Sequence, residues 1–270
     1  MAAHDAGPDT GTNGAAADMN APSVPAEYLL RLADDRLVLG HRLSEWCGHA
    51  PILEEDIALA NIALDLVGQA TALLELAAAR IGDGRTADDL AYFRDAREYR
   101  NVQLVELPKG DFAFTMVRQF AFDVFDVVFL ESLRGSNDAE LAALAGRMLQ
   151  EARYHVRHSG EWVLKLGDGT EESRRRTQAA LDELWRFAGE LFLADDLDRE
   201  LSAAGLVPDP SALRSWWVEQ FVRVIESATL ELPGDTSVAR GGRQGLHTEY
   251  LGHMLAEMQS VARAHPGAEW

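Results

Sequence analysis

Apolar residues are arranged along most of the chain with the three- and four-residue spacing of amphipathic helices. From Pro25 onward this spacing recurs with few interruptions, and no convincing run of alternating apolar and polar residues predicts a strand. Glycine, proline and helix-capping residues divide the pattern into segments. We therefore expect helices over about residues 26–47, 53–80, 111–134, 137–167, 170–194, 210–230 and 247–264.

The order of these helices predicts the fold. The first two and the next two form hairpins with turns near residues 50 and 136, and residues 83–110 connect the hairpins. Within this connection, 87–97 is expected to be partly helical and the apolar segment 102–107 extended. Asn137 followed by Glu140 resembles a capping box at the start of the fourth helix. Two hairpins joined by a long crossover predict an all-α, ferritin-like four-helix bundle with additional C-terminal helices.

Composition predicts one folded domain preceded by a tail. The chain has 270 residues, of which 47% are apolar and 26% charged, so residues 25–270 suffice for one large helical domain. Residues 1–24 contain no Lys, Arg or aromatic residue and are expected to be a disordered tail. The N-terminus lacks the basic start and apolar stretch of a secretory signal, and charges interrupt the most apolar region, 112–130. We expect a cytoplasmic protein without a membrane-spanning segment.

Charge and cysteine content exclude further classes. Lys and Arg number 25 and Asp and Glu 44, so the formal charge is 25 − 44 = −19. This excess of acids argues against a nucleic-acid or anionic-membrane partner. The single cysteine, Cys47, excludes internal disulfides and cysteine-rich metal clusters. Although His49 is close in sequence, we expect Cys47 to be a small buried residue at a helix end rather than half of a thiol–imidazole pair.

Four acidic residues are predicted to lie at one depth on the four bundle helices. Antiparallel pairing about the two turns brings Asp34 or Asp35 level with Asp65, and Asp123 level with Glu151. Asp65, Asp123 and Glu151 each lie on an otherwise apolar helix face, where an acid requires a partner or a metal. Carboxylate-bridged di-metal bundles place their ligands in this way, with one acid on two helices and Glu-x-x-His on the other two.

The histidines of that pattern are missing. Gly68 stands three residues after Asp65, and Tyr154 stands three residues after Glu151; His155 occupies only the four-residue spacing. Carboxylates without imidazole hold iron poorly. We therefore interpret Asp34, Asp65, Asp123 and Glu151 as a decayed di-iron position without bound metal, whose acids pair with Arg36, Arg147, Tyr154 or His155. An active di-metal oxygenase using these four acids is the alternative, and a stand-alone homo-oligomeric helical protein is a third hypothesis.

Several motifs resemble one protein family. They are Leu-Arg-Leu-Ala-Asp-Asp at 30–35, Glu-Trp-Cys-Gly-His-Ala-Pro at 45–51, Asn-Ile-Ala-Leu-Asp-Leu-Val-Gly-Gln-Ala at 61–70, Glu-Ala-Arg-Tyr-His at 151–155, Leu-Gly-Asp-Gly-Thr at 166–170, His-Thr-Glu-Tyr-Leu-Gly at 247–252 and Leu-Ala-Glu-Met-Gln at 255–259. Together, from about residue 26 to Trp270, the chain resembles the C subunits of bacterial multicomponent phenylacetyl-CoA 1,2-epoxidases. Tyr250 departs from the His expected in the 247–252 motif.

The resemblance implies a non-catalytic role within an oxygenase complex. It implies a paralogous A subunit that holds a di-iron centre, a small B subunit, and a reductase with FAD and an iron–sulfur cluster that takes electrons from NADPH. The C subunit of such a complex pairs with the A subunit and supports it, and an isolated C subunit can form a homodimer. No catalytic or cofactor-binding residue is expected in this chain itself.

Two further segments carry weaker signals. Gly241-Gly242-Arg243-Gln244-Gly245 precedes a predicted helix and could cradle a phosphate, but it lacks the P-loop spacing, and we interpret it as a flexible connector. Trp216-Trp217 is expected to anchor the core or an interface.

Overall fold

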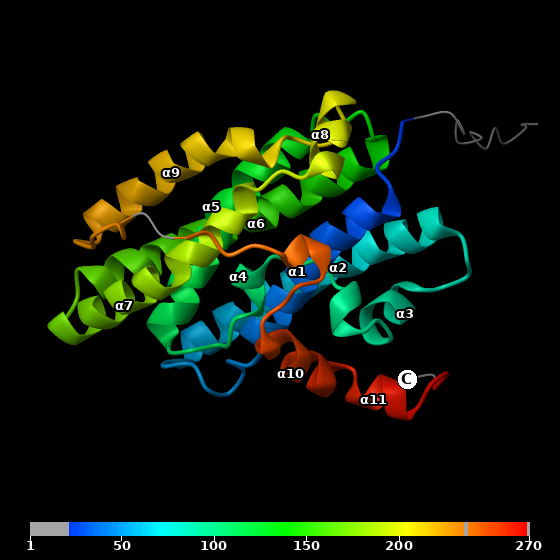
Figure 1. Ribbon diagram of the computed structural model, residues 1–270. Coiled ribbons are helices and arrows are strands. Elements are labelled where there is room, and N and C mark those ends of the chain that lie inside the picture. Colours follow the sequence, from blue (N-terminus) through cyan, green and yellow to red (C-terminus); the bar gives the residue numbers. More distant parts are fainter. Residues whose placement is uncertain (1–21, 235–236, 269–270) are drawn as a thin grey trace, which may run out of the picture.

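A computed structural model describes residues 22–234 and 237–268, which fold as an all-α domain (Figure 1). No strand occurs in these two ranges, and the prediction of an all-α bundle followed by further helices is confirmed. The α-helices are α1 (Ala26–Ser44), α2 (Leu53–Ile81), α3 (Ala87–Tyr92), α4 (Gln103–Glu106), α5 (Phe112–Leu133), α6 (Ala139–Gly167), α7 (Glu171–Ala188), α8 (Asp196–Ala203), α9 (Pro210–Ser227), α10 (Glu249–Met258) and α11 (Ser260–Ala264). Short 3₁₀ turns occupy Ala96–Glu98, Gly189–Phe192 and Gly242–Gln244.

Two helical hairpins, α1–α2 and α5–α6, form the four-helix centre of the domain (Figure 1). Local sequence fixes their ends. Acids fill the first turn of α2, where they complement the helix dipole, and Gly82 ends α2 in the left-handed conformation with φ 67°. Asp111 caps α5 by accepting the amide of Phe114. These ends agree with the sequence prediction.

Additional helices cover part of this centre. α7 and α9 pack against α5 and α6, whereas α4 packs against α1 and α3 against α2 (Figure 1). Aromatic side chains join α9 to α5, because Phe221 stacks on Phe120 with ring centroids 5.2 Å apart and on Trp217 at 4.5 Å. Trp217 is buried and donates from its indole to the Ala121 carbonyl at 2.9 Å, as expected of an anchor. Its neighbour Trp216 is 40% exposed.

Residues 103–106 of the segment expected to be extended form the short helix α4, and two distant carboxylates cap it. The amide of Val102 donates to Asp35 at 2.8 Å, and the amide of Gln103 donates to Glu190 at 2.7 Å. These acids satisfy backbone groups that begin a helical turn and allow the short α4 to form. The local apolar pattern contains no sign of either partner.

Three helix ends also differ from their predictions. Asp138, not Asn137, caps α6, since it accepts the Leu141 amide, and Glu140 reaches Arg80 instead of closing a capping box. The helix predicted over 170–194 ends at Ala188 and continues as a 3₁₀ turn. The last predicted helix divides at Gln259, whose side-chain amide donates to the carbonyls of Ala91 and Arg94.

The predicted tail over residues 1–24 lies almost entirely outside the described residues. Of this segment the structure describes residues 22–24. Val24 is fully buried, its amide donates to Asp138 at 2.8 Å, and its carbonyl accepts from Arg80. The chain is therefore anchored to the first turn of α6 directly before α1 begins.

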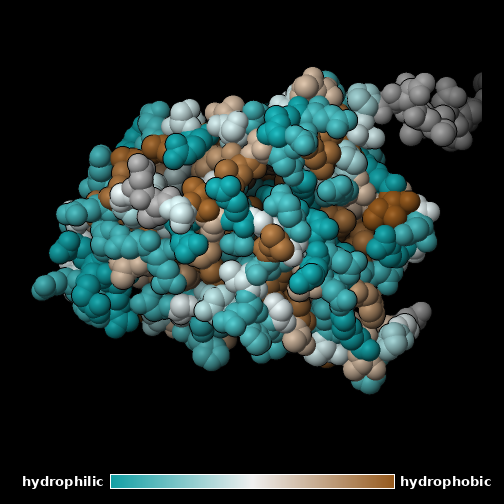
Figure 2. Space-filling model, viewed as in Figure 1, coloured by the Kyte–Doolittle hydropathy of each residue, from teal (hydrophilic) through white to brown (hydrophobic). Residues whose placement is uncertain are grey.

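One helix, α2, is long and apolar enough to cross a membrane if length and composition alone are considered. Half of its most apolar window is buried inside the domain, as occurs in core helices of soluble proteins. The molecular face in Figure 2 is mainly hydrophilic, with apolar residues scattered in small groups, which is ordinary for a folded domain.

Two glycines of α6 give a matched test of the packing. A Cβ at Gly167 would lie 2.3 Å from the carbonyl oxygen of Ala228, whereas a Cβ at Gly146 would meet nothing within 4 Å. We expect Gly167→Ala to lower the free energy of unfolding by about 1–3 kcal/mol. Gly146→Ala should raise it by roughly 0.5–1 kcal/mol because alanine favours the helix interior. Urea denaturation of both variants tests this, and equal effects would contradict the close approach of the α6 end to Ala228.

Candidate functional site

A buried arginine at the centre of the bundle connects its four helices. Arg36 of α1 is 1% exposed. Its Nε donates to Gln69 of α2 at 2.9 Å, and its Nη2 donates to Asp126 of α5 at 2.5 Å. Gln69 in turn donates to Glu151 of α6 at 2.7 Å. A single guanidinium therefore links α1 to α2 and α5 directly, and to α6 through one amide.

The guanidinium compensates a carboxylate that the core would otherwise not accept. Asp126 is buried among apolar side chains, and this burial raises its pKa, while the positive charge of Arg36 acts against the rise. The third nitrogen of Arg36 donates to the Leu32 carbonyl at 3.1 Å, so each nitrogen of its guanidinium has an acceptor. The pair is thus both neutralised and hydrogen-bonded, which a buried ion pair requires.

Asp123 lies in the core without a cation. Its carboxyl oxygens accept from the Gln119 amide and the Ser159 hydroxyl, each at 2.7 Å. Burial raises the pKa of Asp123 well above its ordinary value, and the two hydrogen bonds act against this rise. None of the four partners predicted for these acids therefore binds Asp123.

The outer seam between α2 and α6 carries two histidine–carboxylate pairs. His155 lies 3.0 Å from Asp65, and His158 lies 2.8 Å from Glu55. The Asp65 side chain is 37% exposed, so this seam reaches the protein surface. Tyr154 is 41% exposed and stacks on His158 with ring centroids 6.2 Å apart.

Asp34 faces away from the other three acids of the predicted set. It accepts from the guanidinium of Arg94 and from the amide of Arg100 at 2.8 Å, both in the connection between the hairpins. The neighbouring Asp35 accepts the Val102 amide and the guanidinium of Arg243. Both acids of α1 therefore bind the connecting segments and not the centre of the bundle.

The side chains present do not fit a pair of metal ions. The position between the four helices holds the positive charge of Arg36, which would repel a cation, and the Asp34 carboxylate is engaged elsewhere. Gly68 offers no ligand, and Tyr154 is partly exposed and stacked on His158. Within residues 22–234 and 237–268, no group of three or more His, Cys, Asp or Glu side chains is arranged to hold a metal.

The glycine-rich segment binds an anion that belongs to the protein itself. The Gly242 amide donates to the Glu190 carboxylate at 2.8 Å, and the partly buried Arg243 donates to Asp35. The segment is therefore tied to α1 and to the turn after α7, contrary to the flexible connector that we expected. Glu190 carried no recognisable signal in the sequence, because its partners lie far away along the chain.

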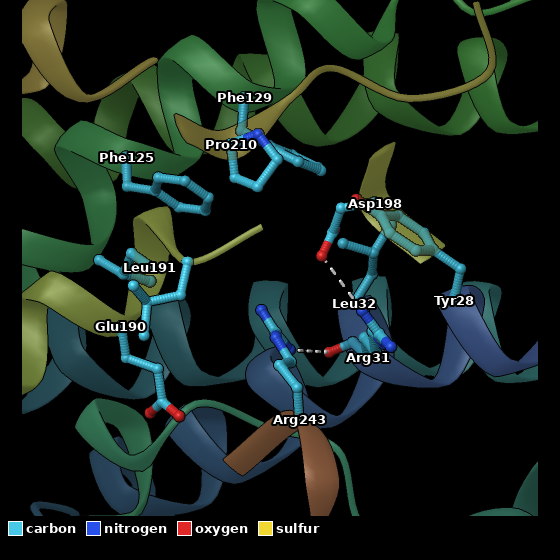
Figure 3. Close-up of a pocket in the computed structure, with 11 residues that line it drawn as sticks. Tyr28, Arg31, Leu32, Phe125, Phe129, Glu190, Leu191, Asp198, Pro210 and Arg243 are labelled. Carbon is cyan, nitrogen blue, oxygen red and sulfur yellow. Dashed lines mark hydrogen bonds and ion pairs between the residues drawn. The ribbon is translucent and has the colours of Figure 1, made fainter. Parts of the chain in front are cut away.

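A small cavity lies beside this segment (Figure 3). It has a volume of about 20 Å³, which is enough for a single water molecule and too small for an organic ligand. Arg31 and Asp198 pair at its edge, 3.3 Å apart, and Arg243 lies beside Arg31 and donates to the Arg31 carbonyl at 3.2 Å (Figure 3). This cavity is therefore not a substrate site.

The expectation for Cys47 is wrong. Its side chain is exposed rather than buried. The Cys47 carbonyl, and not the thiol, lies 3.0 Å from the His49 ring. The turn that follows α1 thus leaves the thiol in solvent, and the sequence-based rejection of a thiol–imidazole pair agrees with the contact observed.

The fold and the Arg36 centre define a class: a ferritin-like helical protein whose core helices are joined by an arginine network. The family model described as phenylacetic acid catabolic protein matches residues 13–270, and the chain belongs to this family. The chain is 49% identical over 243 residues to the C subunit of the 1,2-phenylacetyl-CoA epoxidase of Escherichia coli (strain K12). The aligned residues cover 90% of this chain and 98% of that protein. The family resemblance seen in the sequence is confirmed.

Removal of Arg36 should be costly. In Arg36→Met, the Asp126 carboxyl stays buried without its cation, and we expect a loss of roughly 3–5 kcal/mol in the free energy of unfolding. Arg36→Met combined with Asp126→Leu should recover most of this loss, because both polar partners are then absent. Chemical denaturation measures both effects. Arg223→Met, which breaks an exposed pair with Glu219, is the control and should cost at most about 1 kcal/mol; an equal loss there would contradict the role of Arg36.

Asp123→Asn should stabilise the protein above about pH 4. The unfolded Asp ionises near pH 3.9, whereas burial keeps the folded group protonated to much higher pH. Wild-type stability therefore falls as pH rises between these two pKa values, and the asparagine variant avoids this loss because its amide does not ionise. The introduced amide should keep a contact with Gln119 and can donate to Ser159, which also donates to the His155 carbonyl. Thermal melts from pH 4 to 8 should show an advantage that grows with pH; a constant difference would contradict it.

Proposed function

We propose that this chain is the structural subunit of a multicomponent phenylacetyl-CoA 1,2-epoxidase in aerobic phenylacetate catabolism. In this role it pairs with the catalytic subunit and supports it without binding a metal itself. The observation that carries the proposal is the Arg36 network, since it places a cation and its hydrogen bonds where the four core helices meet. The 49% identity to the C subunit of a known epoxidase, over nearly the full length of that protein, supports the same role.

The proposed complex has its cofactors in other chains. The partner is a di-iron A subunit of related fold, assisted by a small B subunit, and a reductase supplies electrons from NADPH through FAD and an iron–sulfur cluster. We assign a cytoplasmic location to the assembly, because the substrate is a coenzyme A thioester and NADPH is an intracellular reductant. The Asp34, Asp65, Asp123 and Glu151 set is, in this proposal, a former metal position that now serves packing.

Reconstitution tests the proposal. Epoxidation of phenylacetyl-CoA by the A subunit, B subunit and reductase should require this chain. Glu151→Gln in this chain should leave turnover within about twofold of wild type, because the variant can still accept the Gln69 hydrogen bond. Full turnover by a mixture that lacks this chain would contradict a supporting role.

Metal analysis separates the structural role from that of an independent di-metal oxygenase. After incubation of the purified chain with Fe(II) and removal of free ions, we expect iron close to zero per chain by elemental analysis. Iron approaching two per chain, lost together with activity in Glu151→Ala, would instead support the oxygenase.

A further inference from the structure

The outer face of α2 carries large aliphatic side chains that the domain leaves exposed. Leu53 is 72% exposed, Ile57 54% and Leu64 69%, and all three lie on one stripe of the helix. Gly68 continues the stripe, and a Cβ placed there would meet nothing within 4 Å. We call these four residues the α2 face. A helical stripe of exposed aliphatic residues is a feature of protein-binding surfaces rather than of solvated ones.

The α2 face stays open after the described elements have packed. α7 and α9 lie against α5 and α6, and α4 lies against α1. α3 packs against α2 but leaves Leu53, Ile57 and Leu64 exposed. On the neighbouring helix α6, Tyr154 is 41% exposed beside the seam formed by Asp65 and His155. The open surface therefore extends from α2 across the seam to an aromatic residue of α6.

Unpaired acids flank the α2 face at both ends. Glu54 lies at its N-terminal end and Glu75 beyond its C-terminal end; both are exposed, and neither forms an ion pair with the described residues. They are 21 residues apart, or about 31 Å along the helix. An occupant of the face thus has an apolar middle and should carry positive charge toward each end.

This charge pattern disfavours a second copy of the chain. Glu54 lies 10 residues before Leu64, and Glu75 lies 11 residues after it. An antiparallel contact of two α2 helices centred on Leu64 would therefore place Glu54 of each copy opposite Glu75 of the other. Like charges at such positions oppose association, and the formal charge of −19 on each chain adds to the repulsion.

We propose that the α2 face is the docking site for the catalytic subunit. The matching surface of that subunit is an apolar helix surface with Lys or Arg near both ends. The inference rests on the proposed function, from which the identity of the partner is taken. The helix that carries this face is joined to the centre of the bundle, because Gln69 of α2 binds both Glu151 and Arg36. The docking surface is therefore held by the same network that fixes the core helices.

A substitution at the centre of the face tests the proposal. With the full-length chain and the purified catalytic subunit, Leu64→Asp should raise the Kd measured by titration calorimetry about tenfold or more, because a charge would be buried in an apolar contact. Its melting temperature should stay near that of wild type, since Leu64 is largely exposed. Val261→Asp on α11 is the matched control, because Val261 is 56% exposed and lies outside the face; its Kd should be unchanged.

Charge reversal tests the chemistry of the partner. Glu54→Lys with Glu75→Lys should weaken binding, and the effect should shrink at high salt. Glu226→Lys with Glu257→Lys changes the net charge equally at exposed sites elsewhere and should have little effect. Equal weakening by the two pairs of substitutions would contradict a local charge match.

The outcomes separate the docking face from the proposed function. Absence of binding by the wild-type chain would overturn the proposed function. Wild-type binding that Leu64→Asp leaves intact would overturn only the docking face. A homodimer that Leu64→Asp dissociates would overturn the choice of partner.

Discussion

The bond between the buried guanidinium of Arg36 and the carboxylate of Asp126 is the constraint on which the bundle depends. Neither group is tolerated alone in an apolar core, so α1 and α5 must approach closely enough to pair them. Gln69 completes the arrangement, because its carbonyl accepts from Arg36 while its amide donates to Glu151. Directional hydrogen bonds of this kind favour one register of the four helices, whereas apolar packing alone tolerates sliding.

A second set of carboxylates holds the irregular segments against α1. Asp34 binds the backbone and guanidinium groups of the connection between the hairpins, and Asp35 binds α4 and Arg243. Glu106 accepts from the amide of Thr248 and lies 2.7 Å from the His247 ring, which attaches the start of α10. Long connections expose many unpaired amides, and buried carboxylates satisfy them at a few points. Part of the acidic composition thus has a structural function.

The helices could be predicted from sequence because their signals are local. Apolar spacing and Asp111 or Gly82 specify where a helix begins or ends, and the hairpin order specifies the bundle. The centre could not be predicted in the same way. Counting residues outward from each turn predicted which acids lie at the same depth in the bundle, but not the direction in which each side chain points. The sequence therefore did not show that Asp34 faces the connection, and it did not identify Asp126. The fate of segment 102–107 depended on Glu190, a residue 87 positions from Gln103. Contacts between residues this far apart produce no periodic pattern in the sequence.

An arginine network at the centre of the bundle has a consequence for assembly. A bundle organised by metal ligands gains its final geometry only when metal is loaded, because charged ligands repel one another without the ion. Here the compensating cation is part of the chain, so the core and the helices around it can form during folding. The exposed stripe of Leu53, Ile57 and Leu64 belongs to a helix fixed by Gln69 of the same network. A helix fixed in this way presents its exposed stripe in one conformation before any partner binds, and rigid surfaces lose less entropy on binding.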